Sequence, residues 1–290
     1  MGKIDRTPVS ALLISDGRPG HFRLGEGILA TIARQRPTHV RRMELRRPKW
    51  IPPRMLSRLT NSSCKPENIL RYIYGVNAED IPNVDLIVSA GGDTLAANVA
   101  VKKILGDDVK NIFYGSLRRY RPEDFSVVLT SNTSQADRDN HFLTLKPSDI
   151  DNAPLEALLP PNAQRDHRWM PHHVGLIVGG PTGTIAYNKK DWDALFSFVA
   201  ELHRRHGTRW TIANAPRTPD DISDRMAAMV ASPAFGIDNY IDIREQGAGS
   251  LNSLFATVEA VVCTADSSTG VSEAVWAHRA CIAARPASYK

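Results

Sequence analysis

The chain has 290 residues, 42% of them hydrophobic and 23% charged, which is typical of a folded globular protein with room for two domains. No run of about 18 apolar residues occurs, so we expect no membrane span, and the N-terminus lacks the apolar core of a secretory signal. The cysteines, Cys64, Cys263 and Cys281, have no zinc-binding spacing, and we expect a reduced, cytoplasmic protein without a bound metal.

Positive charge is concentrated in the first half of the chain. Residues 1–150 hold 23 Lys and Arg against 16 Asp and Glu. Much of the excess lies in the stretch Arg34–Arg58, where four apolar residues are interleaved: Trp50, Ile51, Met55 and Leu56. Such a stretch suits anionic lipid head groups or a phosphorylated glycolipid, so we expect a peripheral protein at the inner face of a membrane. A solvated loop is the alternative interpretation, and we expect no nucleic-acid partner.

Short apolar runs alternate with helical patterns along the chain. The predicted strands are Ala11–Ser15, Val84–Ser89, Asn111–Tyr114, Val127–Thr130, Val174–Val178, Trp210–Ala213, Tyr240–Ile243, Ala260–Cys263 and Cys281–Ala283. The predicted helices are Leu24–Arg34, Leu95–Leu105, Asp191–His206, Asp220–Val230, Leu251–Thr257 and Val271–His278. Because strands separated by one helix need crossover connections, the sheets should be parallel and covered on both faces. We predict an α/β fold of two doubly wound, Rossmann-like domains that face a cleft.

A proline-rich stretch at residues 147–172 predicts the boundary between these domains. We expect an N-terminal, acceptor- or membrane-facing domain at residues 1–165 and a C-terminal, nucleotide-binding domain at residues 166–290. The sequence given ends soon after the predicted strand Cys281–Ala283, so we expect either an unusually short end to the second domain or a domain of which part is missing.

Two loops of the first domain follow predicted strands, where ligands bind in doubly wound sheets. The loop Ser15–His21 holds Gly17 and Arg18, and its Asp16 and His21 can accept a proton near neutral pH. The loop Ser89–Thr94 holds Gly91, Gly92 and Asp93, and Asp93 either orients an acceptor hydroxyl or caps the following helix. Helix capping is likewise the alternative for Asp16 and His21.

Three loops of the second domain have compositions that suit a diphosphate. Gly179, Gly180 and Thr182 offer backbone contacts, and Arg217 lies in a rigid proline loop that suits a bidentate clamp. A hydroxyl-rich turn then joins the strand Ala260–Cys263 to a helix, and the N-terminus of a helix favours an anion. Its candidate donor-binding residues are Asp266, Ser267, Ser268, Thr269, Ser272 and Glu273, of which Glu273 can accept two ribose hydroxyls. An ordinary helix cap is the alternative.

Together these segments resemble the ELM1 family of plant mitochondrial-fission proteins and bacterial relatives regarded as glycosyltransferases. In chain order, the resemblance is carried by Ser15–His21, Ser89–Thr94, Ser116–Arg119 and Thr264–Ala274. The family usually has Ser-Met where this chain has Thr269-Gly270, so the hydroxyl is kept and the methionine is not. The family is in turn similar to GT-B glycosyltransferases, whose Gly-rich first loop ends in Gly-His and whose Ser-rich loop before a Glu binds a nucleotide sugar.

The resemblance implies metal-independent, cofactor-free transfer of a sugar from a nucleotide-diphosphate donor to an anionic glycolipid or lipopolysaccharide-type acceptor. Asp16 or His21 would deprotonate the acceptor, with Arg118 and Arg119 on the same side. The amides of Gly179 and Gly180, the Arg217 side chain and the 267–269 turn would stabilise the departing diphosphate. Two alternatives stay open: a non-catalytic membrane scaffold of the organelle-fission type, and a phosphotransferase with a Gly-Gly-Asp loop.

Overall fold

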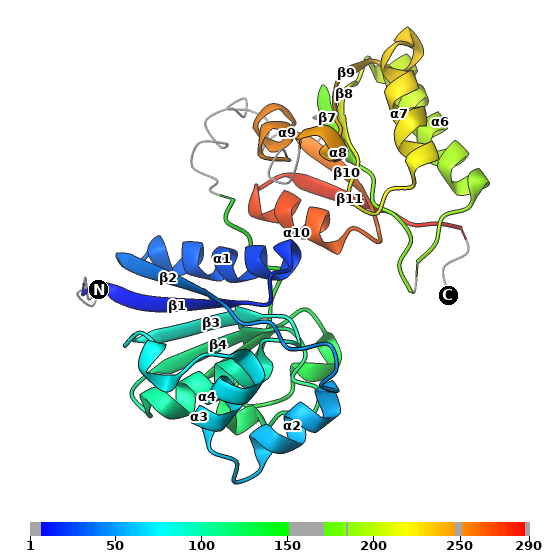
Figure 1. Ribbon diagram of the computed structural model, residues 1–290. Helices are drawn as coiled ribbons and strands as arrows, with labels where there is room; N and C mark the ends of the chain where they lie inside the picture. Colours follow the sequence, from blue (N-terminus) through cyan, green and yellow to red (C-terminus); the bar gives the residue numbers. More distant parts are fainter. Residues whose placement is uncertain (1–6, 151–170, 184, 247–250, 288–290) are drawn as a thin grey trace. The chain divides into compact units, whose positions relative to one another are not determined.

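The computed structural model describes residues 7–150, 171–183, 185–246 and 251–287 (Figure 1). The chain divides into two compact units, Met1–Asp149 (unit 1) and Ile150–Lys290 (unit 2). The boundary predicted at residues 165 and 166 lies outside the described residues.

Unit 1 contains a parallel sheet with the strand order β2-β1-β3-β4-β5-β6. Its strands are β1 (Val9–Ser15), β2 (Thr38–Glu44), β3 (Leu86–Ala90), β4 (Lys110–Tyr114), β5 (Val127–Thr130) and β6 (His141–Leu143). Its main helices are α1 (Pro19–Ala33), α2 (Pro53–Asn61), α3 (Pro66–Ile69) and α4 (Leu95–Leu105). The strand order reverses between β1 and β3, the switch point where such sheets bind ligands.

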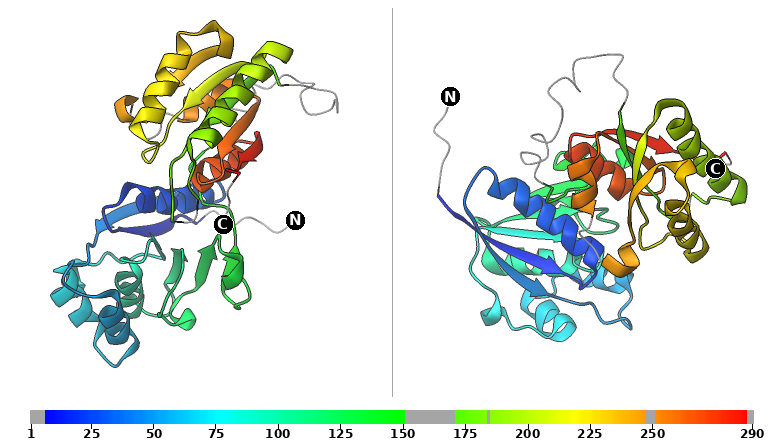
Figure 2. Two further views of the ribbon diagram at one scale, coloured as in Figure 1. Left: turned by 90° about the vertical axis from the view of Figure 1, so that its right-hand side faces the viewer. Right: turned by 90° about the horizontal axis from the view of Figure 1, so that it is seen from above.

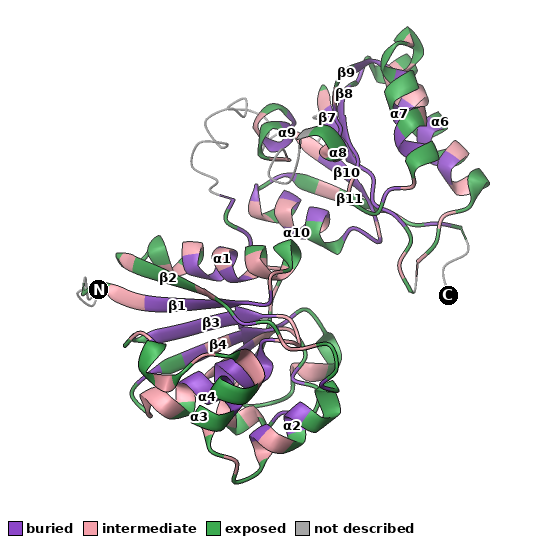
Figure 3. Ribbon diagram, in the orientation of Figure 1, coloured by how far each residue is buried: buried purple, intermediate pink, exposed green. Residues whose placement is uncertain are grey.

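Helices cover both faces of this sheet, as Figures 1 and 2 show. Along β1, Leu12 and Ile14 belong to the core on the α4 side, whereas Ala11 and Leu13 belong to the core shared with α1. This explains the uninterrupted apolar run, because a strand buried on both faces has no solvent side (Figure 3).

Unit 2 contains a parallel sheet with the order β11-β10-β7-β8-β9. Its strands are β7 (His173–Ile177), β8 (Arg209–Ala213), β9 (Ile237–Ile241), β10 (Ala260–Thr264) and β11 (Ala280–Ala284). Its helices are α6 (Lys189–His206), α7 (Asp220–Val230), α8 (Ile243–Gln246), α9 (Leu251–Thr257) and α10 (Ser268–Trp276). One core joins α6 and α7 to the sheet, and α9 and α10 pack in the other. Here the order reverses between β7 and β10.

The predicted fold class of two doubly wound α/β units is confirmed, with corrections at single elements. Strands β2 and β6 were not predicted, and β9 begins at Ile237 rather than Tyr240. Helix α1 begins at Pro19, five residues before its predicted start, because proline suits the first helical turn.

The stretch Arg34–Arg58 is likewise more structured than predicted. It begins directly after α1 and contains all of β2 and the start of α2. Ile51 and Leu56 are core residues at 2% and 1% exposure, whereas Trp50 and Met55 are exposed at 76% and 46%. Within the described ranges, no helix has the length and hydropathy needed to span a bilayer.

Candidate functional site

Asp16 and His21 lie beside each other after β1. His21 Nδ1 is 2.7 Å from Asp16 Oδ2, and the Asp16 side chain is 2% exposed against 29% for the imidazole. The other carboxylate oxygen accepts a hydrogen bond from the Arg18 amide at 3.1 Å. A buried carboxylate that accepts from Nδ1–H holds the imidazole in one orientation and leaves Nε2 as its basic nitrogen. The pair has the arrangement of a general base with its positioning acid.

Gly91 brings the loop after β3 against this pair. Its backbone has a φ of +88°, a conformation that residues other than glycine rarely adopt. A Cβ atom at this position would collide with the His21 ring. Two loops predicted separately from sequence therefore meet at the imidazole, at the switch point of the unit 1 sheet.

Asp93 binds arginines rather than capping the next helix. Its carboxylate accepts from Arg47 Nε at 2.9 Å and lies 3.2 Å from the Arg18 guanidinium. Thr94 is the N-cap residue of α4 and has no side-chain cap. The capping interpretation of Asp93 is wrong, and its engagement by Arg47 and Arg18 also weakens the kinase-like interpretation of the Gly-Gly-Asp loop.

Other residues predicted on the acceptor side lie in the loops after β1, β3 and β4. A Cβ at Gly17, whose φ is +80°, would lie 2.5 Å from Arg46 Nε. A Cβ at Gly92 would lie 2.6 Å from Arg118 Cζ. Arg118 and Arg119 follow β4, next in the sheet to β3. Arginine side chains of unit 1 thus lie in the loops that follow β1, β2 and β4.

The backbone amides of Gly179 and Gly180 are occupied by side chains of unit 2. Gly179 donates to Thr264 Oγ1 at 2.7 Å, and Gly180 donates to Asp266 Oδ2 at 2.8 Å. This geometry does not support the expectation that these amides hold a diphosphate. They instead fasten the loop after β7 to the loop after β10, across the switch point of the second sheet.

Asp266 and Arg217 form a second polar centre. The Asp266 side chain is fully buried, and the Arg217 side chain, 54% exposed, lies 3.5 Å from Asp266 Oδ2. The Arg217 guanidinium also donates to the Asp266 carbonyl at 3.3 Å. In the described part of the chain, Asp266 Oδ1 has no hydrogen-bond partner. That oxygen is buried, so its hydrogen-bonding capacity is unmet in this structure.

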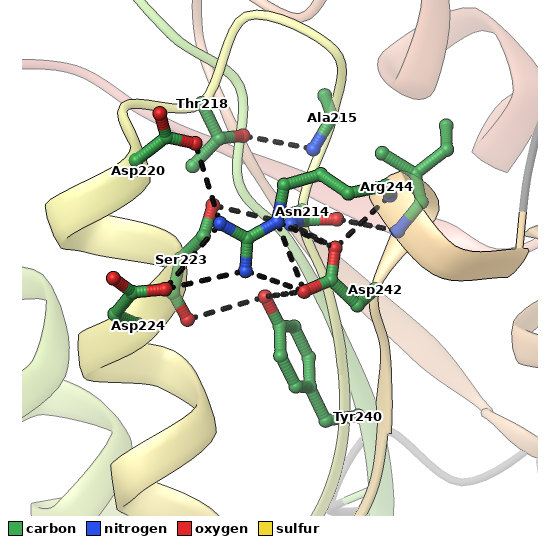
Figure 4. Close-up of polar contacts among 10 residues, drawn as sticks. Asn214, Ala215, Thr218, Asp220, Ser223, Asp224, Tyr240, Asp242 and Arg244 are labelled. Atoms are coloured by element: carbon green, nitrogen blue, oxygen red, sulfur yellow. Dashed lines mark hydrogen bonds and ion pairs between the residues drawn. The ribbon is translucent and has the colours of Figure 1, made fainter.

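The loop that carries Arg217 is held at both ends, and Figure 4 shows the contacts of Asn214 and Asp242 at its first end. Thr218 Oγ1 donates to the Val178 carbonyl at 2.7 Å. Asn214 Nδ2 donates to Asp242 Oδ1 at 2.8 Å, and Asp242 also accepts from Arg244 Nε. Hydrogen bonds from Arg244 and Asn214 lower the pKa of Asp242 despite its burial. This network gives the Arg217 loop a fixed position.

Helix α10 begins at Ser268, three residues earlier than predicted. Ser267 is its N-cap residue, and Ser268 and Thr269 are exposed in its first turn. Glu273 lies about one turn further along and is half-buried. Ser272, which was predicted to bind the donor, donates from its Oγ to the Ser268 carbonyl within the helix at 2.9 Å.

Two further residues of the predicted donor site have local structural contacts. A Cβ at Gly270 would lie 2.9 Å from Cys263 Sγ, so glycine here permits close packing of α10 on β10. Thr182 Oγ1 accepts from the Ile185 amide at 3.0 Å, which closes a local turn.

Tyr187 is a residue that sequence reasoning missed. Its hydroxyl donates to the Ala284 carbonyl at 2.8 Å and accepts from the Ala265 amide at 2.9 Å. Burial raises the pKa of Tyr187 to about 12, so the hydroxyl keeps its proton. No local sequence signal marks it, because its partners are 97 and 78 residues away.

The family model described as mitochondrial fission ELM1 matches residues 19–289. The chain belongs to the ELM1 family. No curated protein matches this ELM1-family chain.

Among solved structures, the UDP-GlcNAc 2-epimerase of Methanocaldococcus jannaschii matches with a TM-score of 0.51 and 12% identity, covering 96% of this chain and 83% of that one. MurG of Acinetobacter baumannii matches with a TM-score of 0.48 and 12% identity, over 95% and 78% of the two chains. The ELM1-family chain therefore has a GT-B-like fold.

Proposed function

We propose that this chain is a glycosyltransferase. It moves a sugar from a nucleotide-diphosphate donor, bound by unit 2, to a hydroxyl of an anionic glycolipid or lipopolysaccharide-type acceptor, bound by unit 1. The observation that carries the proposal is the pair formed by the buried Asp16 carboxylate and His21 Nδ1, 2.7 Å apart. The GT-B-like fold supports it, since the Methanocaldococcus protein with this fold is named for a nucleotide sugar.

In the proposed reaction His21 is the general base. Nε2 takes the proton of the acceptor hydroxyl while its oxygen bonds to the anomeric carbon of the sugar. The bond from that carbon to the diphosphate breaks, and the nucleoside diphosphate leaves. The Asp16 carboxylate stabilises the imidazolium that forms. The geometry thus favours His21 as the base and Asp16 as the residue that positions it.

The leaving diphosphate is placed at the N-terminus of α10, where the helix dipole favours negative charge. Arg217, held in its fixed loop, supplies a second positive charge. Glu273 accepts hydrogen bonds from the ribose. In this proposal the protein neutralises the diphosphate, so neither a metal nor a cofactor is required.

The same proposal places the protein at the inner face of a membrane. Trp50 and Met55 are exposed. Trp50 follows Lys49 in sequence, and Met55 lies between Arg54 and Arg58. This combination suits an anionic lipid surface. A lipid-linked acceptor could then react while it stays in the membrane. Co-sedimentation with anionic vesicles, reduced by Trp50→Ala, is the expected result.

The test is release of nucleoside diphosphate from each common nucleotide sugar, with a bacterial lipid extract as acceptor and with a chelator in a parallel arm. We expect release from one donor, unchanged by the chelator and lost in His21→Ala. If no nucleotide or nucleotide sugar binds while vesicles do, the chain is a scaffold and the proposal is wrong.

A further inference from the structure

A pocket of about 460 Å³ lies in unit 1 beside the Gly91-Gly92 turn. Two segments far apart in the chain line it. The first comprises Pro52, Pro53, Arg54 and Ser57 at the start of α2, and the second comprises Arg118, Arg119 and Tyr120 after β4, with Gly92 between them. Its size is that of a small-ligand site.

The charge of this pocket is one-sided. Three arginines line it and, among the residues that the structure describes, no carboxylate does. In the described part of the chain, the guanidinium groups of Arg54, Arg118 and Arg119 form no hydrogen bond or ion pair. Arg47, by contrast, is paired with Asp93. Guanidinium groups gathered without a counter-charge repel one another, and an anion bound among them relieves that repulsion.

Arg118 has an unusual backbone that sets the position of its side chain. Its φ is +55°, in the left-handed region, which residues with a Cβ seldom occupy and which is concentrated at functional sites. Its guanidinium lies against Gly92, where a Cβ would be 2.6 Å from Cζ. The absence of a side chain at residue 92 therefore makes room for the Arg118 charge.

The other walls are apolar or neutral. Pro52 and Pro53 are exposed to the pocket, and Tyr120 is 6% exposed. Burial raises the pKa of Tyr120 to about 12, so the phenol adds no negative charge. The exposed faces of Pro52 and Pro53 suit the carbon face of a sugar ring, so the pocket combines an apolar wall with positive charge.

Adjacent glycines join this pocket to the Asp16–His21 pair. Gly91 packs on the His21 ring, and Gly92 packs on the Arg118 guanidinium. We propose that the pocket formed by Arg54, Arg118 and Arg119 binds a phosphomonoester group of the acceptor, so that the acceptor is a phosphorylated sugar. This inference rests on the proposed function in taking the unit 1 ligand to be the acceptor. A dianion matches several guanidinium groups better than a single carboxylate charge does.

The test is binding rather than turnover, with the full chain. Glucose 6-phosphate and glucose are titrated by calorimetry, and phosphatidylcholine vesicles with and without phosphatidic acid are used in sedimentation. Arg118→Gln and Arg54→Gln are compared with Arg138→Gln, which removes the same charge from an exposed position of unit 1 outside the pocket.

We expect a phosphate-bearing probe to bind, glucose not to bind, and each pocket variant to weaken binding about tenfold or more. Arg138→Gln should leave the affinity unchanged. Glucose 6-phosphate binding indicates a soluble sugar phosphate, and binding only to phosphatidic acid vesicles indicates a lipid-linked phosphate. The inference is overturned if neither probe binds or if all three variants weaken binding equally.

Nucleoside-diphosphate binding is measured on the same variants. If the phosphate probe binds through Arg118 but no nucleotide binds, the proposed transferase is wrong and the phosphate pocket stands. If a nucleotide binds normally and no phosphate probe does, the pocket assignment is wrong and the donor site stands.

Discussion

His21 Nδ1 lies 2.7 Å from Asp16 Oδ2, and the carboxylate is almost fully buried while the imidazole is partly exposed. This relationship makes the two residues one functional unit. In His21→Ala we expect kcat to fall about 10²–10⁴-fold, because the acceptor loses its base, with the dissociation constant of the donor unchanged.

The double variant Asp16→Asn/His21→Ala checks the assignment of roles. Because Asp16 acts through the imidazole, removing it after His21 has gone should cost no further activity. Steady-state kinetics on the single and double variants make this comparison. If the two losses multiply, Asp16 acts independently of the imidazole and its assignment as the residue that positions His21 is incorrect.

Gly91→Ala should displace the imidazole. The substitution adds a methyl group where the His21 ring lies, at a φ of +88°. Gly106→Ala is the matched control, because Gly106 has a φ of +95° and nothing within 4 Å of its Cβ position. Both variants should lose about 1–3 kcal/mol of folding stability, measured by urea unfolding, because alanine is strained at a positive φ. Only Gly91→Ala should also lose activity; equal activity in the two variants would contradict the packing argument.

Gly180→Ala should impair donor binding. Its new Cβ would collide with the Arg217 carbonyl, whereas Gly183→Ala, in the same loop, meets nothing within 4 Å. Because a backbone atom cannot rotate away, the Arg217 loop has to move. We expect at least about tenfold weaker nucleotide binding in Gly180→Ala and no change in Gly183→Ala, measured by calorimetry. Unchanged affinity in both would remove Arg217 from the donor site.

Asp242 should make the free energy of unfolding of unit 2 depend on pH. Hydrogen bonds from Arg244 and Asn214 hold the pKa of Asp242 below its ordinary value of 3.8. Its stabilising contribution is therefore fully present above about pH 4 and is lost as the pH falls toward the folded-state pKa. Asp242→Asn should cost about 1–3 kcal/mol at pH 7 and less at pH 3.

The control for this prediction is Asp220→Asn, whose side chain is 88% exposed in its ion pair with Arg244 and which should cost less than about 1 kcal/mol. Thermal unfolding of both variants between pH 3 and pH 7 gives the comparison. A loss in Asp242→Asn that does not vary with pH would show that its charge is not the stabilising feature.

The sequence predicts the strands of this fold well where burial is complete on both faces. Apolar runs such as Ala11–Ser15 have no polar interruption and could be identified directly. Strand β2 was missed because its Val40, Arg41 and Arg42 are all exposed, and an exposed edge strand has no apolar signature. Helix α1 was placed too late because Pro19 and Gly20 are as typical of a loop as of a helix start.

The candidate sites were predictable as loops but not as sets of contacts. The position after a strand drew attention to Asp16, His21 and Gly91, and the fold brings them together. No sequence signal showed that Thr264 and Asp266 would occupy the amides of Gly179 and Gly180, since each hydrogen bond spans more than 80 residues. The pocket formed by Arg54 and Arg118 could not be predicted either, because the two segments that line it are far apart in the sequence.

The central claim is that unit 2 binds a nucleotide donor, and a thermal-shift screen with UDP, GDP, ADP, CMP and TDP tests it most directly. A nucleotide at about 100 times its dissociation constant adds about 2.7 kcal/mol to the free energy of unfolding. We expect one nucleotide to raise the melting temperature, with the shift lost in Glu273→Ala and kept in Glu201→Ala, which removes an exposed carboxylate from α6. No shift with any nucleotide, or an equal shift in Glu273→Ala, would contradict the account.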